Sequence, residues 1–168
     1  AAASVDGQFY IFGGNSALGL LNDLYRFDIK QLTWWPVVPG SGATPSRRAG
    51  HALCATPSRD LVLFGGRGQV RRTGSSSSSS SSSSISAEFT SLNDVWRFSP
   101  SRGQWTLLSQ SDRLSARTSA TAPAGRAHAA VGMIGHRLFV YGGKDASTDI
   151  LFDDVWAFHL EVGRWTFI

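Results

Sequence analysis

Four histidines and one cysteine are the side chains here that could bind a metal or act as nucleophiles, but their spacing favours neither chemistry. The histidines are His51, His128, His136 and His159. No two of them share a helix or hairpin at the spacing of metal ligands. Cys54 lies within an apolar run and is typical of a buried structural thiol. A single cysteine can form neither an internal disulfide nor a cysteine zinc cluster. We expect no metal and no cofactor.

Three aspartates, Asp23, Asp94 and Asp154, recur at one position of a repeated unit and could be taken for catalytic carboxylates. A catalytic pair occurs once and converges in a cleft, so the repetition favours a structural role. We expect these carboxylates to cap turns or to pair with Arg48 or Arg126 in an adjoining strand. The sequence therefore predicts no catalytic residue.

The repeated unit occurs three times with its parts in the same order, and each copy begins with an apolar run that ends in a glycine pair. These runs precede Gly13 and Gly14, Gly65 and Gly66, and Gly142 and Gly143. Short apolar runs stopped by glycine predict strands. Since each pair leads toward another strand and not into a helix, a phosphate-binding glycine loop is not indicated.

A second strand with alternating aromatic residues follows each glycine pair. The alternating pairs are Tyr25 with Phe27, Trp96 with Phe98, and Trp156 with Phe158. A period of two places each pair on one face of a strand, which we expect to be buried. Eleven residues beyond each repeated aspartate stands a tryptophan that begins a further strand, at Trp34, Trp105 and Trp165.

The turns before these tryptophans and the segments before the glycine pairs differ between copies. Gly103 and Gly163 predict tight hairpins with a residue at positive φ, whereas Leu32 stands at this point in the first copy, whose turn should differ. A Pro, Arg, His signature precedes a fourth strand in the second and third copies, at Pro45, Arg48 and His51 and at Pro123, Arg126 and His128. The first copy is expected to lack this inner strand.

Four short antiparallel strands with a glycine pair, an aromatic strand and a fixed tryptophan resemble the kelch repeat, whose family fold is a β-propeller of four-stranded blades. The resemblance implies an all-β partial propeller of about three blades, the first without its inner strand. The repeats are expected at residues 1–40, 41–109 and 110–168, with a low-complexity insert at 67–91. In such a fold the aromatic faces pack between neighbouring blades. Three blades leave two faces uncovered, so we expect further blades from the parent chain or a second subunit.

The insert contains ten consecutive serines, Ser75 to Ser84, and lengthens the loop after the second glycine pair well beyond the usual connection. Polyserine has no apolar groups to offset the entropy of ordering, so this tract is expected to be disordered.

The charge pattern and the resemblance together suggest where a partner binds. The formal net charge is +4. In kelch propellers the loop after the glycine pair and the loop before the inner strand emerge on one face, where members often bind acidic peptides. That face is expected to carry eight residues: Asn15, Arg47, Arg48, Arg67, Arg71, Arg72, Arg126 and Lys144. Guanidinium groups bind carboxylates and phosphates, which predicts recognition of an acidic or phosphorylated segment of another protein. Arg48 and Arg126 have the competing interpretation of blade-to-blade ion pairs.

We therefore expect a non-catalytic protein-interaction module. One alternative is a targeting or regulatory part of a larger kelch-containing enzyme, such as a phosphatase or a ubiquitin-ligase adaptor. A galactose-oxidase-like copper enzyme is disfavoured, because Tyr10, Tyr25 and Tyr141 all lie at core aromatic positions of the repeat. The arginines are scattered and not clustered with aromatic partners, which argues against nucleic acid. No apolar stretch is long enough to span a bilayer, so we expect no membrane partner and a cytoplasmic or nuclear location.

Overall fold

The computed structural model describes residues 1–69, 89–110 and 121–168, and these form three antiparallel β-sheets. Blade 1 consists of β1 (Ala2–Val5), β2 (Gln8–Ser16), β3 (Gly19–Asp28) and β4 (Thr33–Val37). Blade 2 consists of β5 (Arg48–Ala49), β6 (Ala52–Ala55), β7 (Leu61–Gln69), β8 (Phe89–Ser99) and β9 (Gln104–Ser109). Blade 3 consists of β10 (Ala130–Ile134), β11 (Arg137–Tyr141), β12 (Val155–His159) and β13 (Arg164–Phe167). The serine tract, Arg71 and Arg72 lie outside the described residues.

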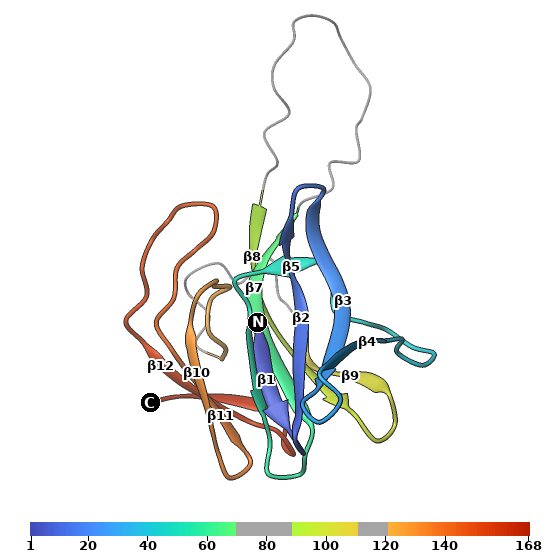
Figure 1. Cartoon of the computed structure of the whole chain (residues 1–168). Coiled ribbons are helices and arrows are strands. Elements are labelled where there is room, and N and C mark those ends of the chain that lie inside the picture. Colours follow the sequence, from blue (N-terminus) through green and yellow to red (C-terminus); the bar gives the residue numbers. More distant parts are fainter. Residues whose placement is uncertain (70–88, 111–120) are drawn as a thin grey trace, which may run out of the picture.

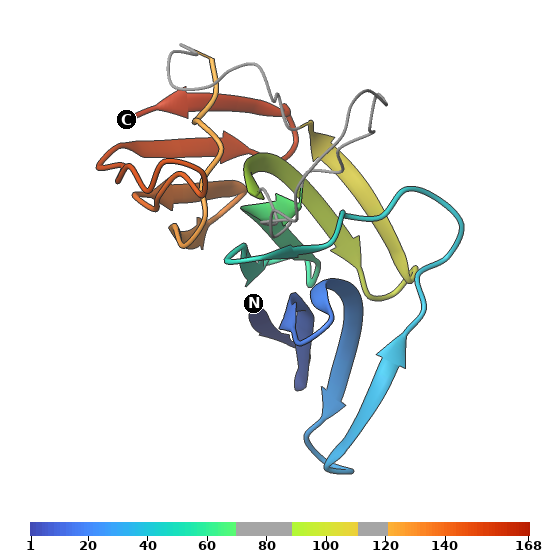
Figure 2. The same cartoon turned by 90° about the horizontal axis from the view of Figure 1, so that it is seen from above.

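The all-β, multi-bladed architecture expected from the repeats is confirmed. Strands of blades 1 and 3 are hydrogen-bonded in chain order, from the inner strand to the tryptophan strand, and in blade 2 both β5 and β6 pair with β7, which β8 and β9 follow (Figure 1). Viewed from above, the three sheets fan out from the region of the N-terminus and lie side by side (Figure 2). The three described ranges contain no helix that could cross a membrane.

Two apolar clusters fill the spaces between neighbouring blades. The first lies between blades 1 and 2 and includes Phe12, Leu24, Leu63, Trp96 and Phe98. The second, between blades 2 and 3, includes Val62, Phe64, Leu138, Val140 and Phe158. Because strand side chains alternate, blade 2 supplies one of its faces to each cluster, and the sheets therefore stabilise one another by stacking.

One aromatic contact is repeated at both blade junctions. The residue before each glycine pair meets the repeated tryptophan of the next blade edge to face: Phe12 packs on Trp105 with ring centroids 5.2 Å apart, and Phe64 on Trp165 at 5.4 Å. The glycine pairs let adjoining backbones approach closely. At Gly66, with φ of 100°, an added Cβ would lie 2.8 Å from the His51 Cβ and 2.9 Å from the Ala49 carbonyl oxygen. A side chain here would separate the strands.

Two expectations for the first repeat are wrong. Blade 1 has an inner strand, because β1 pairs with β2 from Ala2 opposite Ile11 to Val5 opposite Gln8. The Pro, Arg, His signature lies before the inner strand in blades 2 and 3, and the equivalent positions of blade 1 precede Ala1, so the motif could not reveal this strand. Nor does the first tryptophan turn differ, since Leu32 adopts the left-handed conformation of Gly103 and Gly163, with φ of 54° against 62° and 71°. The hairpin register imposes this geometry on a leucine.

The repeated aromatic residues differ in burial according to their neighbours. Trp96, Trp105 and Trp156 are nearly inaccessible, and Trp165 is half-buried. On blade 1, Tyr25 and Trp34 are 39% and 46% exposed, because none of the three described blades covers that face. The opposite face of blade 3 is likewise uncovered and leaves Tyr141 56% exposed.

Candidate functional site

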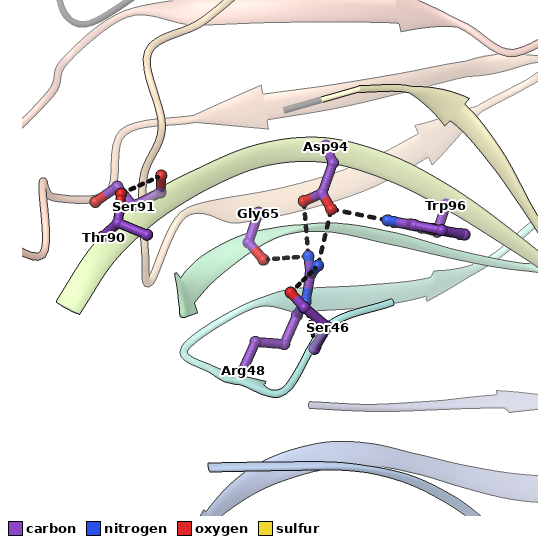
Figure 3. Close-up of polar contacts among 7 residues, drawn as sticks. All are labelled: Ser46, Arg48, Gly65, Thr90, Ser91, Asp94 and Trp96. Atoms are coloured by element: carbon purple, nitrogen blue, oxygen red, sulfur yellow. Dashed lines mark hydrogen bonds and ion pairs between the residues drawn. The ribbon is translucent and has the colours of Figure 1, made fainter. Parts of the chain in front are cut away.

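The most strongly bonded polar side chain in blade 2 is Arg48, whose guanidinium group is completely buried (Figure 3). It donates to both carboxylate oxygens of Asp94, at 2.7 and 2.8 Å, and to the Gly65 carbonyl oxygen at 3.0 Å. Its Nε and Nη2 donate to the carbonyl and hydroxyl oxygens of Ser46. The Trp96 indole donates to Asp94 Oδ2 at 2.8 Å. This network fixes the segment before the inner strand against β7 and β8.

Blade 3 repeats this arrangement with Arg126. The guanidinium group donates to both oxygens of Asp154 and to the Gly142 carbonyl oxygen, the latter at 3.0 Å. The Trp156 indole donates to Asp154 Oδ2 at 2.7 Å. Although partial burial opposes ionisation, bonds from Arg126 and Trp156 lower the pKa of Asp154 below its usual value. The expected pairing of repeated aspartates with Arg48 and Arg126 is therefore confirmed in both blades.

These pairs decide the role of two of the eight residues proposed to form a binding face. Arg48 and Arg126 are 0% and 1% exposed, so neither guanidinium group can reach a surface ligand. Each guanidinium group pairs with the aspartate of its own repeat, but the Arg126 backbone is bonded to blade 2, since its N–H donates to the Leu92 carbonyl oxygen at 3.0 Å and its carbonyl oxygen accepts from the Gly66 N–H at 2.9 Å. The sequence did not indicate the indole donors, although an aspartate two residues before a tryptophan places both on the same face of a strand.

The surface cations that remain gather where blades 1 and 2 adjoin. Arg47 is exposed directly before β5, and its Nη1 lies 3.5 Å from the Leu20 carbonyl oxygen of the β2–β3 turn. Arg67 lies on β7, opposite Ala49 of β5, with its guanidinium carbon 4.8 Å from the centroid of the Phe89 ring. Asn15 is exposed near the end of β2. The β2–β3 turn and the link from β11 to β12 project from the same end of the sheets (Figure 1).

The third blade contributes less positive charge to this end of the molecule. Lys144 donates to the Asp149 carboxylate at 2.5 Å, so its charge is already paired. Neither Arg47 nor Arg67 has an acidic partner among the described residues. We refer to Asn15, Arg47 and Arg67 as the basic junction.

Two titratable groups, the buried His51 and the partly buried Cys54, are held in their neutral forms. Burial, together with the charges of the Ala1 amino group and Arg48, lowers the pKa of His51 to about 3. Burial raises the pKa of the Cys54 thiol to about 12. Neither state suits a nucleophile or a proton carrier near neutral pH. Within the described ranges, no three His, Cys, Asp or Glu side chains are placed to share a metal ion.

Comparison with known proteins agrees with this architecture. Residues 1–122 match the KLHDC2/KLHL20/DRC7 Kelch-repeats domain, and residues 125–168 match the Kelch motif. The chain therefore belongs to the kelch-repeat family. Kelch repeat domains are generally non-catalytic interaction modules, and this membership supports such a role here.

Several curated proteins contain a similar region. The chain is 34% identical over 143 residues to Rho GTPase-activating protein gacHH of Dictyostelium discoideum, a match covering 84% of this chain and 8% of that protein. It is 26% identical over 105 residues to Kelch domain-containing protein 2 of Bos taurus, covering 62% of this chain and 21% of the relative. The chain thus spans only a small part of these relatives.

A solved structure of the protein YjhT has a similar fold, with a TM-score of 0.67 and 20% sequence identity. The match covers 99% of this chain and 50% of the YjhT chain. The three blades therefore correspond in size to half of that structure.

Proposed function

We propose that this chain binds an acidic or phosphorylated segment of another protein at the basic junction, without catalysis. The observation that carries the proposal is the pair Arg47, directly before β5, and Arg67, on the adjoining strand β7, two cations with no described acidic partner. Arg67 is held in place by its contact with Phe89, and its buried Nε has no hydrogen-bond partner. A guanidinium group held in this way can offer its terminal nitrogens to a carboxylate or phosphate oxygen.

The sequence adds two further cations to this proposal. Arg71 and Arg72 follow β7 in the chain and are included in the proposal on the sequence alone, because they lie outside the described residues. Lys144 is a weaker candidate, since a ligand carboxylate would have to compete with Asp149. Asn15 can supply an uncharged amide donor beside the cations.

A labelled hexaglutamate peptide provides a simple probe of the basic junction. Charge-assisted hydrogen bonds each contribute about 1.5–3 kcal/mol. The double variant Arg47→Glu/Arg67→Glu reverses both charges and removes at least two such bonds. It should weaken peptide binding at least about a hundredfold, as measured by fluorescence anisotropy at low salt. The matched control is Arg137→Glu/Arg164→Glu, which makes the same charge change at exposed positions on blade 3. Equal losses in both variants would mean that net charge alone attracts the peptide, and the junction would be rejected.

The uncovered faces of blades 1 and 3 support a second kind of partner, namely further kelch blades from the parent chain or a second subunit. Tyr141 occupies the position of Phe12 and Phe64, while Trp34 occupies that of Trp105 and Trp165. A third junction of the same kind would therefore join a residue like Tyr141 to one like Trp34. Exposed apolar faces of this kind favour association.

Size-exclusion chromatography with light scattering tests this second partner. We expect the 168-residue chain to self-associate, and we expect Trp34→Arg to reduce the association. A well-behaved monomer with a cooperative melt at all concentrations would contradict the proposal.

A further inference from the structure

A polar recess lies beside the β8–β9 hairpin of blade 2 and has a volume of about 220 Å³. Six of the side chains that line it come from β8, β9 and the turn between them, namely Arg97, Ser99, Ser101, Arg102, Gln104 and Thr106. Asp60, directly before β7, completes the lining. The β8–β9 hairpin and the β2–β3 turn lie at opposite ends of the sheets, so the recess is separate from the basic junction (Figure 1).

The recess opens on the face that blade 2 turns toward blade 3. Arg97 pairs with Val62 of β7 and with Thr106 of β9, so these three side chains share one face of the sheet. Val62 belongs to the apolar cluster between blades 2 and 3. Blade 3 therefore already covers this face, and the recess is the polar margin that stays open after two described blades have packed together.

The recess contains guanidinium groups that donate no hydrogen bond to a described residue. Arg97 is paired with Asp60, but 4.0 Å separate its Nε from the Asp60 Oδ2, which is beyond hydrogen-bond distance. The Arg102 guanidinium group has neither an ion pair nor a hydrogen bond with any described residue. The lining thus has two formal positive charges and one negative charge, which favours a ligand with an anionic group.

The fold of a blade does not require this set of side chains. Arg102 occupies the hairpin position at which the other two copies have Gln31 and Val162. Asp60 likewise has no carboxylate at the equivalent position of either copy. The repeated tryptophans and aspartates recur because the blades need them, whereas these residues distinguish blade 2 from its neighbours.

We propose that this recess binds a small phosphate monoester that carries hydroxyl groups, the class that includes sugar phosphates. Guanidinium groups bind phosphate oxygens, a role that Arg97 and Arg102 can fill, with the hydroxyl groups of Ser99 and Ser101 beside them. The Asp60 carboxylate accepts hydrogen bonds from hydroxyl groups of the ligand. The volume lies below the roughly 300–1,000 Å³ of pockets for drug-sized molecules, so the ligand is small.

The Asp60 carboxylate favours such a ligand over a bare phosphate ion. A bare ion would place its negative charge beside Asp60 and offer that carboxylate no hydroxyl donor of its own ester group. A monoester with hydroxyl groups satisfies both kinds of side chain, since its phosphate faces the arginines and its hydroxyl groups face Asp60.

Isothermal titration calorimetry with glucose 6-phosphate tests the ligand class on the 168-residue chain. Because both parts of the ligand contribute, we expect glucose 6-phosphate to bind at least about tenfold more tightly than glucose or inorganic phosphate. Equal binding of inorganic phosphate would show that any anion suffices and would overturn the proposal. Tighter binding of a phosphoserine peptide would assign the recess to a protein ligand and would also overturn it.

Two substitutions taken from the other repeats test the site. Arg102→Gln installs the residue of the blade 1 hairpin, Gln31, and should weaken the binding of glucose 6-phosphate at least about tenfold without affecting folding. The matched control is Arg137→Gln, which removes the same charge at an exposed position of blade 3 and should change the affinity less than about threefold. Equal losses in the two variants would refute the site.

The location of the bound ligand can be measured separately by titration of backbone amide NMR signals. We expect glucose 6-phosphate to shift the signals of Arg97 and of residues 99–106, and we expect the same shifts in Arg47→Glu/Arg67→Glu. Shifts confined to the basic junction, or lost in that double variant, would place the ligand at the other end of the sheets and contradict the proposal. Failure of the acidic-peptide proposal is therefore distinguishable from failure of this one.

Discussion

Removal of the Arg48 side chain should be among the most destabilising single changes in this protein. Arg48→Met keeps an apolar stem but leaves the Asp94 carboxylate, whose side chain is 9% exposed, without its cation. Breaking a buried ion pair by removing one partner costs about 3–5 kcal/mol, because an uncompensated charge remains in the interior. The Arg126→Met change should cost less, about 2–3 kcal/mol, because the Asp154 side chain is 25% exposed and water can solvate it.

Urea unfolding followed by far-ultraviolet circular dichroism measures these free energies, with the m-value as a check on two-state behaviour. The double variant Arg48→Met/Asp94→Leu should recover more than half of the loss, since it removes both charges. Two results would contradict this inference about blade 2. One is a cost of less than about 1 kcal/mol for Arg48→Met, and the other is a double variant whose loss equals the sum of the losses in Arg48→Met and Asp94→Leu.

Three further predictions concern single residues. Leu32→Gly should stabilise the protein by about 0.5–1 kcal/mol, because leucine is strained at φ of 54° whereas glycine is not; a lower melting temperature would contradict this. The pKa of His51 is lowered to about 3 in the folded state. Below pH 6.5 the imidazole therefore binds a proton in the unfolded state and stays neutral in the folded state. The free energy of unfolding should therefore fall by about 1.4 kcal/mol per pH unit below pH 6.5, and His51→Gln should remove this slope; an unchanged slope would contradict the assignment. With a thiol pKa of about 12, Cys54 should react with an aromatic disulfide reagent at pH 8 only after urea is added, and rapid labelling of the folded chain would refute its burial.

The order of strands and the identity of the buried faces could be predicted from repetition. The glycine pair, the alternating aromatics and the tryptophan recur at fixed spacing, and Trp105 and Phe98 are buried as this pattern requires. The inner strand of blade 1 could not be predicted in this way. Residues Ala2–Val5 are short and small and lack a signature, so their pairing with β2 depends on the free edge of that strand.

The candidate site was harder to predict, since residue type does not determine exposure. Arg47 and Arg48 are adjacent in sequence, yet the first is exposed and the second fully buried. The difference arises because neighbouring side chains in extended backbone point in opposite directions, and only the second meets Asp94. The burial of Arg48 could have been inferred from the repetition of an arginine before His51 and before His128. Residues that contact a surface ligand seldom recur at the same position of two blades.

Blade 1 differs from blades 2 and 3 in the exposure of its aromatic face and of its repeated aspartate. Two features stabilise a blade in this chain, namely an aromatic face that an adjoining blade covers and an arginine that neutralises the repeated aspartate. Blades 2 and 3 have both features, whereas blade 1 leaves Trp34 half exposed and Asp23 without a described cation. The apolar face and the anionic edge therefore lie on the same blade, beside the basic junction at its border with blade 2.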